Sequence, residues 1–293
     1  MAAERLRALR LRSIPPTTPS PALNPPQVTE DQQTIGKNTS PMTEDPFVPS
    51  YADVRVVRAM LARLYLPLEL VLDILERARY WPEESFHSER AVTVEGRWGS
   101  RVYDAKICVL AHVFGENMKK MLGGEKEENV KIREVEFEMQ SHDQGWTSAG
   151  TAGTFNTSSW FETLILRDGA GVAGATPPVP MSNCRSTEFQ RSLEGTGWDI
   201  IPRPSTVPGG PAQDDDGGLT WYLQGNRVAH HHRTTYKVVW GESRFEGNEG
   251  AGGGEGFLES LKEGDWIAVI ARAKYPGWSN DAASVKVTVR YGF

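Results

Sequence analysis

Between residues 51 and 80, apolar side chains recur at helical spacing. In YADVRVVRAMLARLY the apolar positions share one side and the arginines the other, which predicts an amphipathic helix. LPLELVLDILERARYWPE predicts a second helix, because Pro67 suits the first turn of a helix and Pro82 cannot continue one. The sequence therefore predicts a helical hairpin over residues 51–83.

After Ala91 the apolar period changes from 3.6 residues to 2. In VKIREVEFEMQ, Val135, Phe137 and Met139 share one face and glutamates occupy the other, so we expect one buried and one wet face. Because strands follow strands without a long helix between them, this region predicts a mainly β protein with an antiparallel β-sandwich over residues 90–293. The other strand candidates lie in AVTVEGRWGSRVYDAKICVLAHVF, SSWFETLILRD, LTWYLQGN, TTYKVVWGES, WIAVIAR and SVKVTVRY.

Prolines and tryptophans are concentrated in different parts of the chain. Nine of the 19 prolines precede residue 50 and seven more fall between residues 177 and 211, whereas all nine tryptophans lie at or after Trp81. Segments rich in Pro, Gly and Ser bury too little apolar surface to offset their chain entropy. We therefore expect disorder over residues 1–50 and in an insertion at about 169–218, and a flexible glycine-rich loop at 247–256.

Charge and composition narrow the classes of partner. The formal net charge of -6 leaves no basic surface that would neutralise many phosphates, so a nucleic-acid partner is not expected. No run approaches the roughly 18 apolar residues of a membrane span. The two cysteines are too few for a disulfide framework, which favours a reducing compartment, cytoplasmic or nuclear. The arginine-rich start MAAERLRALRLRS leaves a second interpretation open, because it resembles a mitochondrial presequence.

The segment SHDQGW holds the most enzyme-like residues, His142 beside Asp143. A catalytic system needs a nucleophile, a base and an orienting group that converge, and the chain carries no GxSxG elbow, HExxH pair or phosphate-binding loop. We therefore expect Asp143 and Gly145 to shape a turn after a strand. Ligand contact and, further behind, catalysis through His142 and Asp143 stay open as alternatives.

Two polar runs resemble metal sites only superficially. Consecutive histidines, His230 to His232, point in different directions on a strand or turn, and no cysteine nearby completes a tetrahedral set. The run Asp214 to Asp216 lacks the spaced oxygen ligands and the terminal glutamate of a calcium loop. We expect no metal and no cofactor.

Aromatic residues near the predicted strand ends are better candidates for binding. A sandwich gathers its loops at its two ends, where binding residues concentrate. Aromatic rings beside Asp, Asn and His can stack on a sugar or form a protein hot spot, although such rings often serve only the core. The candidate ligand-binding residues are His142, Asp143, Trp146, Trp160, Tyr275, Trp278 and Asn280.

The segment 66–78, LPLELVLDILERA, resembles the first helix of an F-box. That resemblance implies docking on the Skp-type adaptor of a cullin ubiquitin ligase. The following RYWPEESFHSER lacks the second half of an F-box, so an alternative is that this helix packs back onto the sandwich. The residues that would contact the adaptor are Leu66, Pro67, Leu70, Ile74 and Leu75.

The sandwich region is similar to a family of fungal β-sandwich domains. That family also carries an LPxELxxxIL segment in front of the domain, as this chain does, and the resemblance implies domain identity rather than an activity. The shared motifs are SHDQGW, SWFE, Trp-x-Leu-Gln-x-Asn, Val-Val-Trp and GDxIxVxARxxYPGW, at 141–146, 159–162, 221–226, 238–240 and 264–278. The end YPGWSNDAASVKVTVRY also resembles the galactose-binding-like jelly roll of sugar-binding F-box proteins.

These patterns predict a non-catalytic recognition module for a protein or glycan, with a possible role as substrate receptor of a ubiquitin ligase. A first alternative is a structural or interaction protein without a ligand pocket. A second is an enzyme that uses His142 and Asp143. A pocket with convergent polar groups beside exposed rings would distinguish a binding module from a structural protein.

Overall fold

A computed structural model of the chain describes residues 47–98, 103–115, 118, 130–169, 175–179, 185–213 and 218–292. Most of the predicted disordered segment 1–50 lies outside this range. Its last residues belong to the helical region instead. The Ser50 hydroxyl accepts a hydrogen bond from the Asp53 backbone N–H, the Asp53 carboxylate accepts one from the Ser50 backbone N–H, and the Phe47 ring stacks on Tyr80 at 6.2 Å. This capping box satisfies N–H groups that a helix start leaves unpaired.

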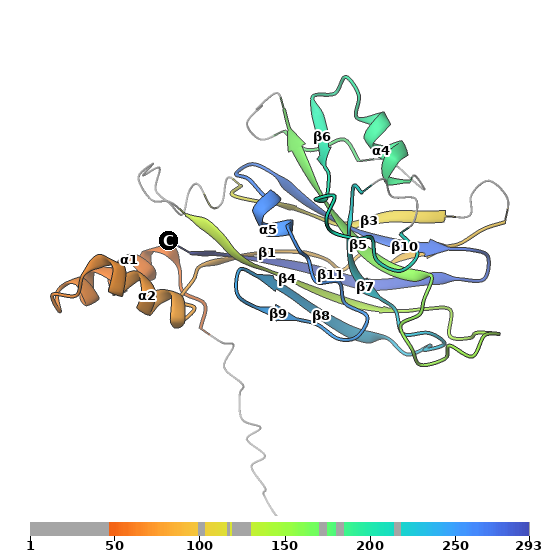
Figure 1. Cartoon of the computed structure of the whole chain (residues 1–293), viewed down its shortest axis with the longest axis horizontal. Helices are drawn as coiled ribbons and strands as arrows, with labels where there is room; N and C mark the ends of the chain where they lie inside the picture. The colour runs from red at the N-terminus through yellow and green to blue at the C-terminus, as the bar shows by residue number, and fades with distance from the viewer. Residues whose placement is uncertain are drawn as a thin grey trace, which may run out of the picture. The chain divides into compact units, whose positions relative to one another are not determined.

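The two predicted helices are present as α1 (Tyr51–Ala62) and α2 (Leu68–Arg77) (Figure 1). Pro67 is the residue that precedes α2, and its carbonyl accepts the first backbone hydrogen bonds of that helix. The predicted segment extends one residue too far, because Glu83 already begins a strand. In the described ranges, no helix is both long enough and apolar enough to cross a membrane.

Two antiparallel sheets follow, as the alternating pattern predicts (Figure 1). In the first, strands run in the order β1-β11-β4-β8-β9, with β2 also on β11; in the second, the order is β3-β10-β5-β6, with β7 also on β5. The first sheet comprises β1 (Glu83–Ser88), β2 (Val92–Glu95), β4 (Lys131–His142), β8 (Thr234–Gly241), β9 (Phe245–Glu246) and β11 (Ser279–Gly292). The second comprises β3 (Tyr103–His112), β5 (Ser159–Asp168), β6 (Trp198–Ile201), β7 (Trp221–Gly225) and β10 (Trp266–Lys274).

The main apolar core lies between the two sheets. Val135, Phe137 and Met139 of β4 are fully buried there, as their spacing predicts, and they meet residues of the second sheet such as Phe161 and Val269. The same core also holds Phe257 from the short helix α5 (Phe257–Ser260). Strands of both sheets thus contribute residues to one shared interior.

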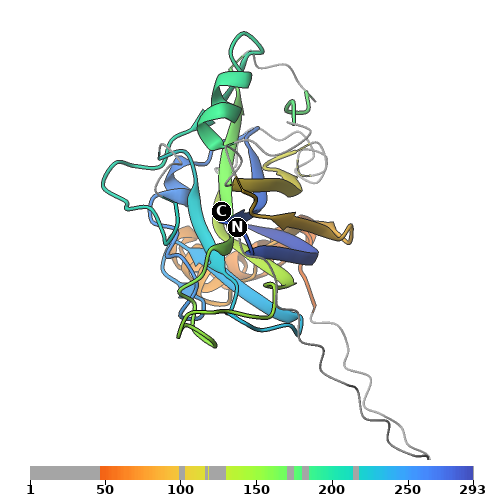
Figure 2. The same ribbon diagram turned by 90° about the vertical axis from the view of Figure 1, so that its right-hand side faces the viewer.

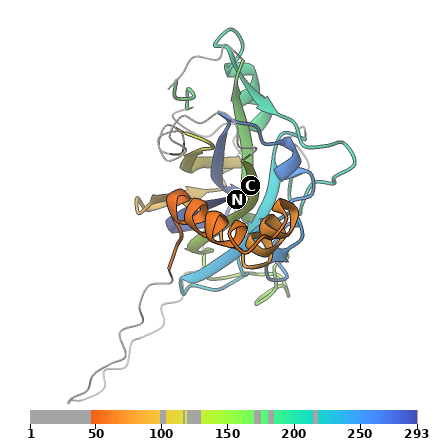
Figure 3. The ribbon, with the colours of Figure 1, turned by 90° about the vertical axis from the view of Figure 1, so that its left-hand side faces the viewer.

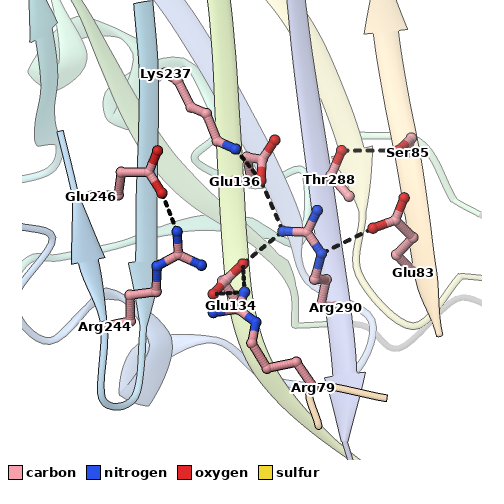
Figure 4. Close-up of polar contacts among 10 residues, drawn as sticks. All are labelled: Arg79, Glu83, Ser85, Glu134, Glu136, Lys237, Arg244, Glu246, Thr288 and Arg290. Carbon is pink, nitrogen blue, oxygen red and sulfur yellow. Dashed lines mark hydrogen bonds and ion pairs between the residues drawn. The ribbon is translucent and has the colours of Figure 1, made fainter. Parts of the chain in front are cut away.

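The outer face of β4 is less uniformly wet than the alternation predicts. Glu138 is exposed there, but Glu134 is only 1% exposed. Two guanidinium groups cover Glu134: Arg79 donates to both carboxylate oxygens, at 2.7 and 2.6 Å, and Arg290 donates at 2.6 Å (Figure 4). The burial of the Glu134 carboxylate is tolerated because two arginines pair with it and donate hydrogen bonds to it.

The expectation of a disordered insertion at 169–218 is wrong for its described part. That part contains α4 (Ser186–Ser192) and β6, and Figure 2 shows α4 beside the sheet that holds β5. Every residue from 159 to 166 of β5 is buried, so both faces of this strand need a cover. The insertion covers the outer face, and the second apolar cluster joins Leu164, Leu166, Phe189, Leu193, Trp198, Ile200, Ala268 and Ile270.

Candidate functional site

The loops after β4 and before β11 lie at the same end of the sandwich. The register of these antiparallel strands pairs His142 with Asp281, so the residues that follow His142 and those that precede Ser279 are neighbours (Figure 1). The opposite ends of the two strands, at Lys131 and Gly292, lie toward α1 and α2. Figure 3 shows both helices in front of that opposite end.

The structure brings Trp146 and the 275–278 turn together. The Trp146 ring lies against Gly277, where a Cβ atom would be 3.2 Å from the ring carbon Cη2. Gln144 links the two loops, because its side-chain Nε2 donates to the Trp146 carbonyl at 2.7 Å and its Oε1 accepts from the Ser279 N–H at 3.3 Å. The predicted aromatic loops that carry Trp146 and the 275–278 turn are therefore in contact.

A further aromatic residue at this end, Trp98, was not predicted. The Gly96 N–H donates to the Trp278 carbonyl at 2.9 Å, which places the loop after β2 on the 275–278 turn. Trp98 is 88% exposed, Trp146 58% and Tyr275 46%, while Trp278 is half-buried. The segment GRWGS, in which glycines flank a tryptophan in a break between strands, carries the signal that could have identified it. We call Trp98, Trp146, Tyr275 and Trp278 the aromatic end surface.

Asp143 anchors a loop rather than facing a ligand. It is fully buried, and its carboxylate accepts hydrogen bonds from the backbone N–H groups of Gly145, Ala229 and His230 at 2.7 to 3.0 Å. The carboxylate therefore does not orient His142. The structural interpretation of the SHDQGW turn fits this geometry, and the enzyme alternative gains no support from it.

His142 is half-buried beside the same loop. Its Nδ1 lies 2.6 Å from the Asp143 carbonyl oxygen, and its Nε2 lies 3.7 Å from a carboxylate oxygen of Asp281. Arg233 approaches the same Asp281 oxygen at 3.5 Å, so one carboxylate faces two basic side chains. His142 therefore borders the aromatic end surface without a nucleophile among these contacts.

Two further predicted ligand-binding residues, Trp160 and Asn280, are buried inside the protein, as Asp143 is. Trp160 is 2% exposed, and its ring N–H donates to Glu162 at 3.2 Å beneath the insertion. Asn280 is fully buried and its side-chain amide donates to the Trp160 carbonyl at 2.9 Å. This bond joins the two sheets, because Asn280 belongs to β11 and Trp160 to β5. Residues 185–213, which the sequence predicted to be disordered, cover Trp160 on the outer face of β5.

The predicted adaptor residues divide between two environments. Leu70 is 50% exposed and Ile74 40%, and Pro67 is also exposed. Leu75 is buried against Val54 and Val71, and Leu66 packs at the margin of that small cluster. None of these side chains joins the apolar clusters of the sandwich. No apolar cluster therefore joins this helix to the sandwich.

Ion pairs attach the hairpin to the sandwich. Arg79 after α2 binds Glu134 of β4, as Figure 4 shows, and Arg133 lies 3.4 Å from the Glu76 carboxylate. The Tyr291 N–H also donates to the Pro82 carbonyl at 3.0 Å. The hairpin is thus held by polar contacts and keeps an apolar surface open.

The histidine run lies in the turn between β7 and β8, beside Asp143. Its rings contact one another, with centroids of His231 and His232 at 4.0 Å. In the described part of the chain, no three or more His, Cys, Asp or Glu side chains are placed to hold a metal ion. The run Asp214 to Asp216 lies outside the described residues.

Trp98, Trp146 and Tyr275 of the aromatic end surface are exposed. A cleft of about 530 Å³ lies elsewhere, beside β7, and none of the predicted site residues lines it. The protein therefore carries a cleft that sequence reasoning did not anticipate.

No protein-family model matches the chain, and no curated protein matches its sequence. The resemblances to an F-box helix and to the fungal sandwich family therefore stay predictions.

Proposed function

We propose that the protein is a non-catalytic recognition protein that binds a protein ligand through the aromatic end surface. The observation that carries this proposal is the gathering of three exposed rings, Trp98, Trp146 and Tyr275, on neighbouring loops of one end. Large exposed aromatic rings in one patch are typical of protein contact sites, where Trp and Tyr supply most hot spots.

A polypeptide suits this surface better than a glycan does. Sugar recognition needs polar groups that converge on hydroxyls beside the stacking ring. Two polar side chains predicted for that role, Asp143 and Asn280, are fully buried and bonded to backbone groups. The exposed rings Trp98, Trp146 and Tyr275 come from separate loops, which favours the extended contact of a protein partner.

The second part of the proposal concerns an adaptor. Leu70 and Ile74, which lie one turn apart and which we call the α2 apolar face, are 50% and 40% exposed beside the buried Val71 and Leu75. This arrangement supports docking of a Skp-type adaptor at α2, in the cytoplasm or nucleus. The 12 residues of β4 span about 40 Å, so adaptor and ligand would bind at opposite ends without competing.

Direct binding to a purified Skp-type adaptor tests the adaptor part. Leu70→Asp with Ile74→Asp places charges on the α2 apolar face, and both positions are exposed, so the variant should keep its circular dichroism spectrum and melting temperature. Phe245→Asp is the control, because Phe245 is a similarly exposed apolar residue on β9. Binding by wild type and control but not by the double variant is expected. No binding by wild type would remove the adaptor from the proposal.

Quantitative pull-downs with wild type and a Trp98→Ala, Trp146→Ala variant test the ligand part. Loss of a defined set of proteins in the variant, with retention in Phe245→Ala, is expected. A glycan array run in parallel distinguishes the other class of ligand. Binding of a glycan that the double variant loses would replace the protein by a glycan, and identical captured sets would show that this surface is not the contact site.

A further inference from the structure

The cleft of about 530 Å³ lies between two loop segments, 206–211 and 249–255, with Phe155 and Tyr222 among the side chains that line it. Its volume falls in the range of about 300–1,000 Å³ that ligand sites occupy. The cleft is lined neither by the aromatic end surface nor by the α2 apolar face. The cleft is therefore separate from both proposed contact surfaces.

One wall of the cleft contacts β7 through an isolated β-bridge between Ala251 and Gln224. The segment 249–253, expected to be a flexible loop, pairs with β7: the Gly250 carbonyl accepts a hydrogen bond at 2.8 Å and the Gly252 N–H donates one at 3.0 Å. Alternate residues of an extended chain turn their backbone groups to opposite edges. Ala251 and Gly253 therefore face away from β7. Among the described residues, the Ala251 carbonyl and the N–H and carbonyl of Gly253 have no hydrogen-bond partner.

Gly252 and Gly253 fit this wall closely against Tyr222 and Glu255. A Cβ atom on Gly252 would be 2.0 Å from the Tyr222 carbonyl oxygen, so only glycine allows this approach. Gly253 differs, because a Cβ there would meet only the Glu255 carboxylate, the movable end of a side chain, at 2.3 Å. Packing requires Gly252, whereas a side chain at Gly253 would displace the Glu255 carboxylate from this end of the wall.

The acidic side chains at the cleft are exposed, whereas its arginine is hydrogen-bonded within the protein. Glu249 and Glu255 are exposed at the two ends of the wall. The cation of the lining, Arg203, donates to the backbone carbonyls of Val207 and Thr220. The accessible side-chain charge is thus negative, and it flanks a short backbone edge with one donor and two acceptors.

We propose that the cleft binds an extended basic peptide segment of a partner protein, which adds as a strand to residues 251–253. Main-chain hydrogen bonds to Ala251 and Gly253 would supply the affinity, and Glu249 and Glu255 would select Lys or Arg side chains near the ends of the segment. This site is independent of the proposed adaptor and ligand surfaces.

Selection from a displayed random dodecapeptide library against the full chain tests the proposal. Wild type should enrich basic, proline-poor peptides, and Gly253→Val should raise their Kd at least tenfold. Gly150→Val is the matched control, because a Cβ at Gly150 meets nothing within 4 Å, and it should bind as wild type does. Thermal melting checks that Gly253→Val stays folded.

Two further measurements keep the proposal falsifiable. Glu249→Lys with Glu255→Lys changes only exposed side chains and should also raise the Kd tenfold or more. Methylation of alternate backbone nitrogens on one edge of a selected peptide should abolish binding, and methylation on the other edge should not. The proposal is overturned if wild type enriches no peptide, if the enriched peptides are acidic, or if Gly253→Val binds them as wild type does. Trp146→Ala should leave peptide binding unchanged, which separates this site from the aromatic end surface.

Discussion

The β-sandwich and the helical hairpin differ in where their apolar side chains go. The sandwich closes its apolar surface between two sheets and beneath the insertion. The hairpin buries only Val54, Val71 and Leu75, and leaves Leu68, Leu70 and Ile74 exposed. The proposed adaptor contact at α2 rests on this difference in exposure.

The means of attachment differ in the same way. The sheets meet mainly through apolar packing, while the hairpin joins the sandwich through the pair Arg79–Glu134 (Figure 4) and through Arg133 and Glu76. Ion pairs at a surface contribute less than core packing, and salt screens them. We therefore expect perturbations of the two regions to have separable effects.

The largest effect is expected for Phe137→Ala, in the middle of the sandwich. The Phe137 ring lies 5.0 Å from that of Trp240 and is fully buried. Its truncation leaves a cavity and should lower the free energy of unfolding by about 3–5 kcal/mol. Urea denaturation measures this value. A loss below about 1 kcal/mol would show that the sandwich core is not what stabilises the fold.

Glu134→Gln should detach the hairpin and spare the sandwich. Removing the carboxylate leaves Arg79 without its partner and weakens the contacts of Arg290. The cost should be about 2 kcal/mol, below the 3–5 kcal/mol of a fully buried pair, because Arg79 is partly exposed. Hydrogen exchange should accelerate in α1 and α2 but not in β5 and β10. Glu138→Gln, on the exposed part of the same strand face, is the control and should change neither.

Acid should weaken the network on the outer face of β4 before it weakens the core. Burial alone would raise the pKa of Glu136, but hydrogen bonds and charges of Arg290 and Lys237 outweigh it and lower that pKa below its ordinary value of 4.5. A carboxyl with a lowered folded-state pKa stabilises the protein above its ordinary pKa, and this stability is lost as pH falls through the folded value. Stability should therefore decrease below about pH 4.5.

Lys237→Gln removes one of the charges that lower the pKa of Glu136, so it should flatten this part of the pH profile. Denaturation curves between pH 3 and 7 measure the difference. The effect is smaller than that of Glu134→Gln, since Glu136 and Lys237 are both accessible to water. An unchanged profile would show that the pair contributes nothing.

The smallest effect on stability is expected for Leu70→Asp with Ile74→Asp. Substitutions at exposed positions usually change stability by less than about 0.5 kcal/mol each. The variant should melt as wild type does. A large drop in melting temperature would mean that the α2 apolar face already packs within the protein, which would remove the contrast between hairpin and sandwich.

Local patterns predicted much of this fold. Helical periodicity identified α1 and α2, and alternation placed Val135, Phe137 and Met139 in the core. These are properties of neighbouring residues, so sequence carries them directly. Strand β1 was missed because EESFHS is too polar to stand out; its pairing with β11 decides its structure.

The candidate sites depended on contacts between distant segments. Trp146 and Trp160 look alike in sequence, as tryptophans near strand ends, yet one is exposed and the other is covered. The cover comes from the insertion, whose described part folds onto the outer face of β5. The composition of the insertion indicated disorder because it is rich in proline. Composition does not show that β5 has an apolar outer face on which the insertion packs.

By itself, then, the sequence determined the secondary structure of the helical hairpin and the inner faces of the sandwich. Tertiary structure alone decided which rings reach solvent, that Glu134 is buried, and that a glycine-rich segment forms one wall of a cleft. The physical reason is that burial depends on every segment packed against a residue, whereas periodicity depends only on its neighbours along the chain.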